Sequence, residues 1–163
     1  MNLFDIQKQK GKSGENAVKE FYNKMGVNII DVTEDKEYQK NDIDFIFNGQ
    51  TVEVKTADYL NRNNNNIILE IISNDNEEDF KKGWLYTSKA DVIIFYNPQE
   101  NITYQFFLKD LKNYYEENKN KIDIKYFNSK EYNNYKYIKC SKLAYIPLNN
   151  LIDNIKNRIV YIN

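Results

Sequence analysis

Apolar and polar residues alternate on both sides of an Asn-Gly pair in NDIDFIFNGQTVEVKTAD, residues 41–58. Alternation with a period of two is typical of half-buried strands, and Asn-Gly favours a type I′ turn because both central residues take a positive φ. The pattern therefore predicts a hairpin with Asn48 and Gly49 as its loop. In this register Phe47 faces Gln50, and every further pair follows from that one.

Charged side chains gather on one face of this hairpin, because residues two apart point the same way. That face carries Asp42, Asp44, Glu53 and Lys55, with Asp44 opposite Glu53 and Asp42 opposite Lys55. The other face carries Ile43, Phe45, Val52 and Val54. A slip of one residue would bury the charges, so the apolar face specifies the register.

The opposed pair of Asp44 and Glu53 destabilises a bare strand pair, because like charges repel. A bound divalent cation would remove that repulsion, and Mg²⁺ is a hard ion that prefers carboxylate oxygens and keeps several waters. Lys55 would add a positive charge beside a reacting phosphate. The alternative is a solvated polar face in a charge-rich chain. The spacing, the turn and the apolar reverse face together favour a metal site.

Periodicity along the rest of the chain predicts alternating helices and strands. A helix is expected from near Ser13, as its N-cap, to near Gly26, with an apolar stripe of Ala17, Val18, Phe21, Tyr22 and Met25. Further strands are expected at 27–32, 67–73, 90–96, 102–107 and 136–148, and further helices at 108–118 and 148–158. This order predicts an α/β sandwich built around one mixed sheet.

Length and composition indicate a single globular domain over residues 1–163, because 41% of the residues are hydrophobic and no linker or repeat interrupts the chain. No run approaches the ~20 apolar residues of a membrane span, and the N-terminus lacks the apolar stretch of a signal peptide. A cytoplasmic location is therefore expected. The single cysteine, Cys140, excludes a disulfide framework within the chain and is expected to be half-buried in a strand.

The absence of histidine restricts the chemistry. It excludes Ser-His-Asp and Cys-His hydrolases and histidine-ligated zinc enzymes. None of the five glycines forms a phosphate-binding loop motif. Hydrolysis would therefore depend on carboxylates, lysine and a hard metal ion. The net charge of −1 argues mildly against a nucleic-acid partner, but a local basic patch is compatible with it.

Glu15 falls in the first turn of the expected first helix, at the margin of its apolar stripe. That position places it near the edge where helix and sheet meet. The alternative is an acid that only complements the helix dipole.

Three short motifs carry a resemblance to a known family. Gly14-Glu15 at a helix start, Asp44 before an apolar run, and Glu53-Val54-Lys55 resemble the PD-(D/E)XK nuclease superfamily, whose members share a restriction-endonuclease-like αβββαβ core with a central mixed sheet flanked by helices. The stretch KGKSGENAVKEFYNKMGVNI together with IDF and VEVKT is most similar to Holliday-junction resolvases and related phage nucleases. Ile43 stands where the family usually has proline.

The resemblance implies a role for each motif residue. Asp44 corresponds to the motif aspartate, Glu53 to the second acid, Lys55 to the motif lysine and Glu15 to the helix acid. Mg²⁺ would be held by Asp44, Glu53, the Val54 carbonyl and Glu15, and Mn²⁺ is expected to substitute. Lys55 would orient the attacking water, and the products would be a 5′-phosphate and a 3′-hydroxyl. Asp42 is an extra acid with no fixed role in the family and is expected to support the site.

The expected activity is that of a Mg²⁺-dependent DNA endonuclease of phage or mobile-element type that acts on branched DNA. Expected phosphate contacts are Lys10, Lys12, Ser13 and Lys89, although a basic run of this length is often only a solvated chain end. A homodimer is expected because four-way junctions are two-fold symmetric. The alternatives are a sequence-specific restriction or repair nuclease, and a non-catalytic nucleic-acid- or protein-binding module on the same fold.

Overall fold

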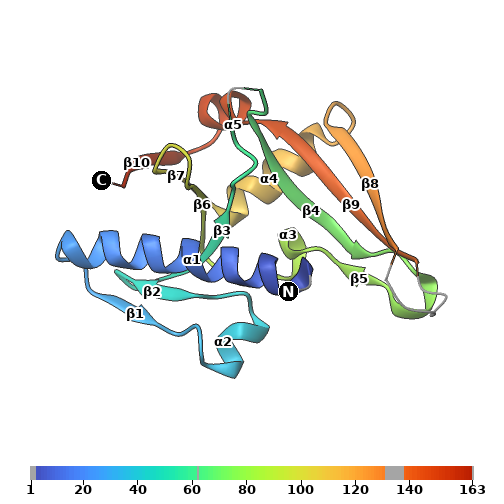
Figure 1. Cartoon of the computed structure of the whole chain (residues 1–163). Helices are drawn as coiled ribbons and strands as arrows, with labels where there is room; N and C mark the ends of the chain where they lie inside the picture. The colour runs from blue at the N-terminus through green and yellow to red at the C-terminus, as the bar shows by residue number, and fades with distance from the viewer. Residues whose placement is uncertain (1–2, 62, 131–137, 163) are drawn as a thin grey trace.

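Six strands form the larger of two sheets (Figure 1). Their spatial order is β1 (Ile29–Asp31), β2 (Phe45–Phe47), β3 (Gln50–Thr56), β6 (Val92–Asn97), β7 (Ile102–Phe107) and β10 (Asn157–Tyr161). The computed structural model describes residues 3–61, 63–130 and 138–162. In that part of the chain β3 and β6 are parallel and the other neighbouring pairs are antiparallel. The predicted central mixed sheet flanked by helices is therefore confirmed.

The long connection between β3 and β6 carries part of a second sheet, so the expectation of one sheet is wrong in this respect. The order of this antiparallel sheet is β5 (Lys81–Lys82), β4 (Asn66–Asn74), β9 (Ile138–Pro147) and β8 (Asp123–Lys130). A parallel strand pair requires a crossover connection. Here the crossover contains β4, β5 and the short helix α3 (Trp84–Thr87).

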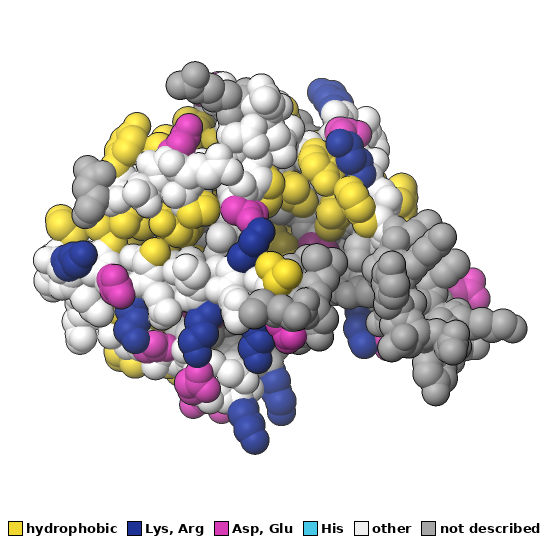
Figure 2. Space-filling model, in the orientation of Figure 1, with side chains coloured by type: hydrophobic (Ala, Val, Ile, Leu, Met, Phe, Trp, Pro, Cys, Tyr) yellow, Lys and Arg dark blue, Asp and Glu magenta, His cyan; other side chains and the backbone are white. Residues whose placement is uncertain are grey.

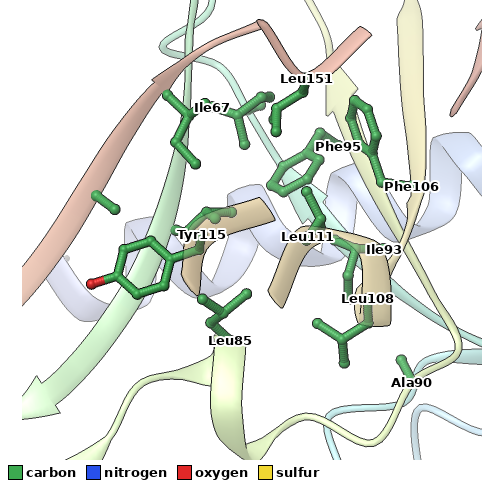
Figure 3. Close-up of a cluster of buried hydrophobic side chains, with 14 of the residues drawn as sticks. Ile67, Leu85, Ala90, Ile93, Phe95, Phe106, Leu108, Leu111, Tyr115 and Leu151 are labelled. Atoms are coloured by element: carbon green, nitrogen blue, oxygen red, sulfur yellow. The ribbon is translucent and has the colours of Figure 1, made fainter. Parts of the chain in front are cut away.

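The larger hydrophobic core joins the two sheets (Figure 3). Its side chains come from both sheets and from the helices α4 (Leu108–Asn118) and α5 (Leu148–Asn154). They include Ile93, Phe95, Phe106, Ile67, Leu69, Leu111, Tyr115 and Leu151, all buried. The predicted bounds of the helix at 108–118 are confirmed, and its Leu108, Leu111 and Tyr115 are buried. The two sheets therefore share one core.

The opposite face of the six-stranded sheet is covered by α1 (Leu3–Lys24). Val18 and Tyr22 of α1 are buried against Val52, Val54 and other apolar residues of the sheet. Gly14 allows this close approach, because a Cβ there would lie 2.0 Å from the Thr56 Oγ1 atom. The helix is thereby pressed against β3, the strand that carries the candidate site.

The start of α1 differs from the prediction. The helix begins at Leu3, ten residues before the expected N-cap Ser13, so Glu15 lies in its middle and not in its first turn. Gly11 has low helix propensity, and Ser13 is a good N-cap residue, so the part of the helix before Ser13 is obscured in the sequence. The end near Gly26 is confirmed, since Gly26 has a φ of 72°. Met25 is 67% exposed and does not belong to the apolar stripe.

The hairpin register is confirmed around the turn and wrong beyond it. Phe47 pairs with Gln50, and Phe45 with Val52, and both Asn48 and Gly49 have positive φ. The regular ladder begins at Phe45, because the preceding residues form a turn with Asp42 at a φ of 53°. Asp44 therefore does not face Glu53 in a regular strand pair. Ile43 lies in the core on the other side of the sheet from Val54.

The last elements also differ from the sequence pattern. The expected final helix at 148–158 ends at Asn154, and β10 follows it as an edge strand. β8 and the short helix α2 (Lys36–Lys40) had no predicted counterpart. The expected late strand at 136–148 corresponds to β9, although residues 136–137 lie outside the described part. Cys140 is half-buried in β9, as predicted.

Basic and acidic side chains are interspersed over the lower half of the face in Figure 2, where α1, β1 and α2 lie. Hydrophobic side chains gather above α1 in the same view. Local basic patches, and not an overall positive field, are therefore the sites to consider for an anionic partner. Within the described residues, no helix is both long enough and apolar enough to cross a membrane.

Candidate active site beside strands β2 and β3

A cleft of about 880 Å³ opens between α1, the turn before β2, and the second half of β3. Its lining includes the predicted site residues Glu15, Asp42, Asp44, Glu53, Val54 and Lys55, together with Lys8, Lys10 and Lys12. Residues distant in the sequence thus meet in one concave surface. The structure brings together the acids and the lysine that the sequence singled out.

Asp44 is fixed where β2 begins. Its backbone N–H donates to the Val52 carbonyl at 2.8 Å, and its Oδ2 accepts a hydrogen bond from the Val54 N–H at 2.7 Å. The Val54 carbonyl points to the same edge of β3 as its N–H, because both groups of a strand residue face one neighbour. The Asp44 carboxylate and the Val54 carbonyl therefore lie on the same side of β3.

Glu53 is almost completely buried, with 4% of its surface exposed. Its Oε1 accepts a hydrogen bond from the Lys55 ammonium group, whereas its Oε2 is buried with no partner among the described residues. The Lys55 ammonium also lies 5.1 Å from the centre of the Trp84 ring. A buried carboxylate oxygen without a partner is costly unless a ligand satisfies it.

Burial raises the pKa of the acids in the cleft. The pKa of Glu53 is raised to about 7 by burial, although Lys55 and a hydrogen bond from Ser88 lower it in part. The pKa of Glu15 is raised to about 7, first by burial and then by the charge of Asp44. Burial also raises the pKa of Asp44, against the opposing hydrogen bond from Val54. Burial and charge repulsion therefore disfavour the ionised form of these acids unless a positive charge compensates it.

Asp42, which has a left-handed conformation, is contacted by the last residue of α3 and by the residue after it. Its Oδ2 accepts a hydrogen bond from the Thr87 hydroxyl, and its carbonyl accepts one from Ser88, both at 3.4 Å. The backbone N–H of Lys89 donates to the Asn41 carbonyl at 2.9 Å. This segment is distant in the sequence, and no short-range pattern reveals that it supports the turn before Asp44.

The predicted phosphate contacts do not all reach the cleft. Lys10 and Lys12 line it, where Lys10 forms an ion pair with Asp58 at 2.7 Å and Lys12 lies 3.7 Å from Glu34. Ser13 is exposed and lines a separate depression on α1. The exposed Lys89 is absent from the cleft lining. Lys8, which belongs to the same basic run as Lys10 and Lys12, also lines the cleft.

The donor set fits a hard cation that keeps several waters. It offers the Asp44 and Glu53 carboxylates and the Val54 carbonyl, with the unpartnered Glu53 Oε2 as the observation that favours a ligand. Within the described residues, no three Asp, Glu or Cys side chains converge closely enough to enclose a metal ion by themselves. A cage made only of side chains is thus absent there, and water and the backbone would complete the coordination.

Comparison with known proteins identifies one informative likeness. No protein-family model and no curated protein sequence matches the chain. The solved structure of a bacterial homing endonuclease, I-Ssp6803I, superposes with a TM-score of 0.50 and 17% sequence identity. The match covers 66% of this chain and 72% of the other. At this identity the likeness shows that the chain has a fold also found in a nuclease.

Proposed function

We propose that this protein is a metal-dependent DNA endonuclease whose active site is formed by Asp44, Glu53 and Lys55. The observation that carries the proposal is the pairing of Lys55 with a buried Glu53 whose second carboxylate oxygen has no partner. Asp44 lines the same cleft, where its carboxylate accepts a hydrogen bond from the backbone N–H of Val54. The nuclease-like fold supports this reading of the site.

Each residue of the proposed site would have its own role in phosphodiester hydrolysis. Asp44, Glu53 and the Val54 carbonyl would hold Mg²⁺ or Mn²⁺, which when bound lowers the pKa of water and polarises the phosphate. Lys55 stabilises negative charge that develops on the phosphate and orients the water. Glu15, with a pKa of about 7, can hold or accept a proton at its carboxylate at neutral pH. Asp42 keeps the turn that delivers Asp44 in place.

Branched DNA is the proposed substrate, on the strength of the Holliday-junction-resolvase-like motifs. A second candidate is a specific duplex sequence, favoured by the likeness to a homing endonuclease. The two differ in what the protein must recognise. A resolvase recognises junction geometry and acts as a two-fold dimer, whereas a site-specific enzyme recognises base edges in the grooves.

The experiment incubates the protein with Mg²⁺ and matched substrates: a four-way junction, a flap, a single strand and a linear duplex made from the same strands. Symmetric nicks in the junction, together with a dimer in sedimentation velocity, support the resolvase proposal. Cleavage of plasmid DNA at one recurring sequence, with the junction left intact, supports the second candidate. No cleavage of any substrate in Mg²⁺ or Mn²⁺ contradicts the enzyme proposal.

A further inference from the structure

Two glycines interrupt α1, and the described chain explains only one of them. A Cβ on Gly14 would collide with Thr56, so the missing side chain there serves packing. A Cβ on Gly11 would meet no atom within 4 Å. Glycine within a helix is destabilising relative to alanine. Gly11 therefore weakens α1 without a compensating contact in the described residues.

Gly11 lies on the wall of the cleft between two lysines. Lys8, Gly11, Lys12 and Glu15 follow each other at spacings of three, one and three residues, which places them on one face of the helix, and all four line the cleft. The stripe runs from the two lysines to Glu15, whose pKa is raised in part by the charge of Asp44. The bare backbone at Gly11 is thus flanked by positive charge and leads to the candidate site.

The lysines of this stripe are free to exchange partners. The only ion pair that the described structure gives to Lys12 is with Glu34, at 3.7 Å, and both side chains are mostly exposed. Exposed pairs of this kind contribute little to stability. Lys10, in contrast, lies 2.7 Å from Asp58, and its carbonyl accepts a hydrogen bond from Thr56. The Lys10 carbonyl therefore links this part of α1 to β3, and the Lys10 side chain is engaged at a shorter distance than that of Lys12.

We infer that Gly11 is the point where the sugar-phosphate backbone of DNA lies directly against α1, with Lys8 and Lys12 neutralising phosphates on either side. Glycine permits close approach of a ligand to the backbone. Lysine contacts to phosphate position a nucleic acid and carry no sequence information. The inference rests on the proposed function for the identity of the ligand, and it names the surface that guides the strand to Asp44.

The inference predicts opposite effects on stability and affinity. Gly11→Ala and Gly11→Leu should both raise Tm by roughly 2–4 °C, because alanine and leucine are good helix formers. DNA affinity should fall by about threefold for Gly11→Ala and at least about tenfold for Gly11→Leu, because the larger side chain holds the phosphates further from the lysines. The salt dependence of binding should weaken by about one unit of log-log slope per lost contact.

The experiment measures fluorescence anisotropy of a labelled four-way junction and its matched duplex in Ca²⁺, with thermal melts of each variant. Asn16→Ala is the control, because Asn16 lies on α1 beside a different depression, and its replacement raises helix propensity without reaching the cleft. Its affinity should equal that of the wild type.

The outcomes distinguish a failure of this inference from a failure of the proposed function. Raised Tm with unchanged affinity in both Gly11 variants overturns the inference and leaves the nuclease proposal intact. A fall in Tm also overturns it, since Gly11 would then serve packing. A graded loss of affinity in a protein that binds but never cleaves DNA supports the inference and contradicts the endonuclease. A wild-type protein that binds neither probe overturns both.

Discussion

The Asp44 carboxylate takes the place of a strand neighbour for Val54, whose N–H donates to its Oδ2 at 2.7 Å. The regular β2–β3 ladder begins one residue later, at the pair of Phe45 and Val52. The hydrogen bond therefore sets the position of the carboxylate relative to the Val54 carbonyl. An acid at this position would serve both the structure of the turn and the proposed chemistry.

Replacement of Asp44 can separate these two roles. Asp44→Asn retains a side-chain oxygen for the Val54 N–H, so its free energy of unfolding should stay within about 0.5 kcal/mol of the wild type. Asp44→Ala should lose about 1–2 kcal/mol, because the Val54 donor is left without its partner. Both variants should lose cleavage. Urea unfolding and a cleavage assay check this, and an active Asp44→Asn protein would remove Asp44 from the proposed metal ligands.

Stability in EDTA should fall as pH rises from about 5 to about 7.5. The folded-state pKa of Glu15 and of Glu53 is about 7, above the ordinary value of 4.5. The folded state therefore binds more protons than the unfolded chain between these values, and stability decreases with pH in that window. For the almost completely buried Glu53 the decrease is on the order of 1–3 kcal/mol.

Urea unfolding in EDTA at the two pH values checks this prediction, with the double variant Glu15→Gln/Glu53→Gln as the comparison. The double variant should be less sensitive to pH than the wild type over this window. Equal pH dependence in the two proteins would show that neither carboxyl has a raised pKa in the folded state.

Trp84 should act on catalysis through Lys55, whose ammonium lies 5.1 Å from the ring centre. Trp84→Leu should lower kcat by about threefold to tenfold, because a cation–π contact of this kind is worth about 1 kcal/mol. Trp84→Phe keeps an aromatic face and should lose less. KM should hardly change, since the ring positions the lysine and not the DNA.

A double-mutant cycle distinguishes this role from simple packing. On a Lys55→Ala background, Trp84→Leu should cause no further loss of the residual rate. Additive losses would mean that Trp84 supports the active site independently of Lys55. The free energy of unfolding of each variant is measured in the same buffer. A value close to that of the wild type excludes general unfolding as the cause.

The hairpin and the charged cluster were predictable because their signals are local. Alternation and Asn-Gly specify the pairing of Phe47 with Gln50, and Glu53 and Lys55 follow on one face. The turn at Asp42 was not predictable, since it depends on hydrogen bonds from Thr87 and Ser88, which the chain brings there through the second sheet. The contact of Lys55 with Trp84 was not predictable either, because Trp84 also reaches the site through the second sheet.

The ends of the fold escaped prediction because their patterns overlap. The N-terminal half of α1 contains Gly11, which favours a loop, and the helix persists because its second half is anchored by Val18 and Tyr22. β10 follows α5 after two residues, so its apolar positions continue the helical pattern of residues 148–154. Residues 157–161 form a strand because they pair with β7, and this contact joins residues distant in the sequence.

The most direct test of the central claim is single-turnover DNA cleavage as a function of Mg²⁺, using the wild type, Glu53→Gln and the control Glu20→Gln. Glu20 is an exposed acid on the same helix as Glu15, beside a separate depression, so its neutralisation changes the net charge equally without reaching the cleft. We predict Mg²⁺-dependent cleavage that EDTA abolishes, retained in Glu20→Gln and lost by at least about a hundredfold in a folded Glu53→Gln protein. Cleavage by Glu53→Gln at the wild-type rate, or cleavage that persists in EDTA, would contradict a metal-dependent site built on Glu53.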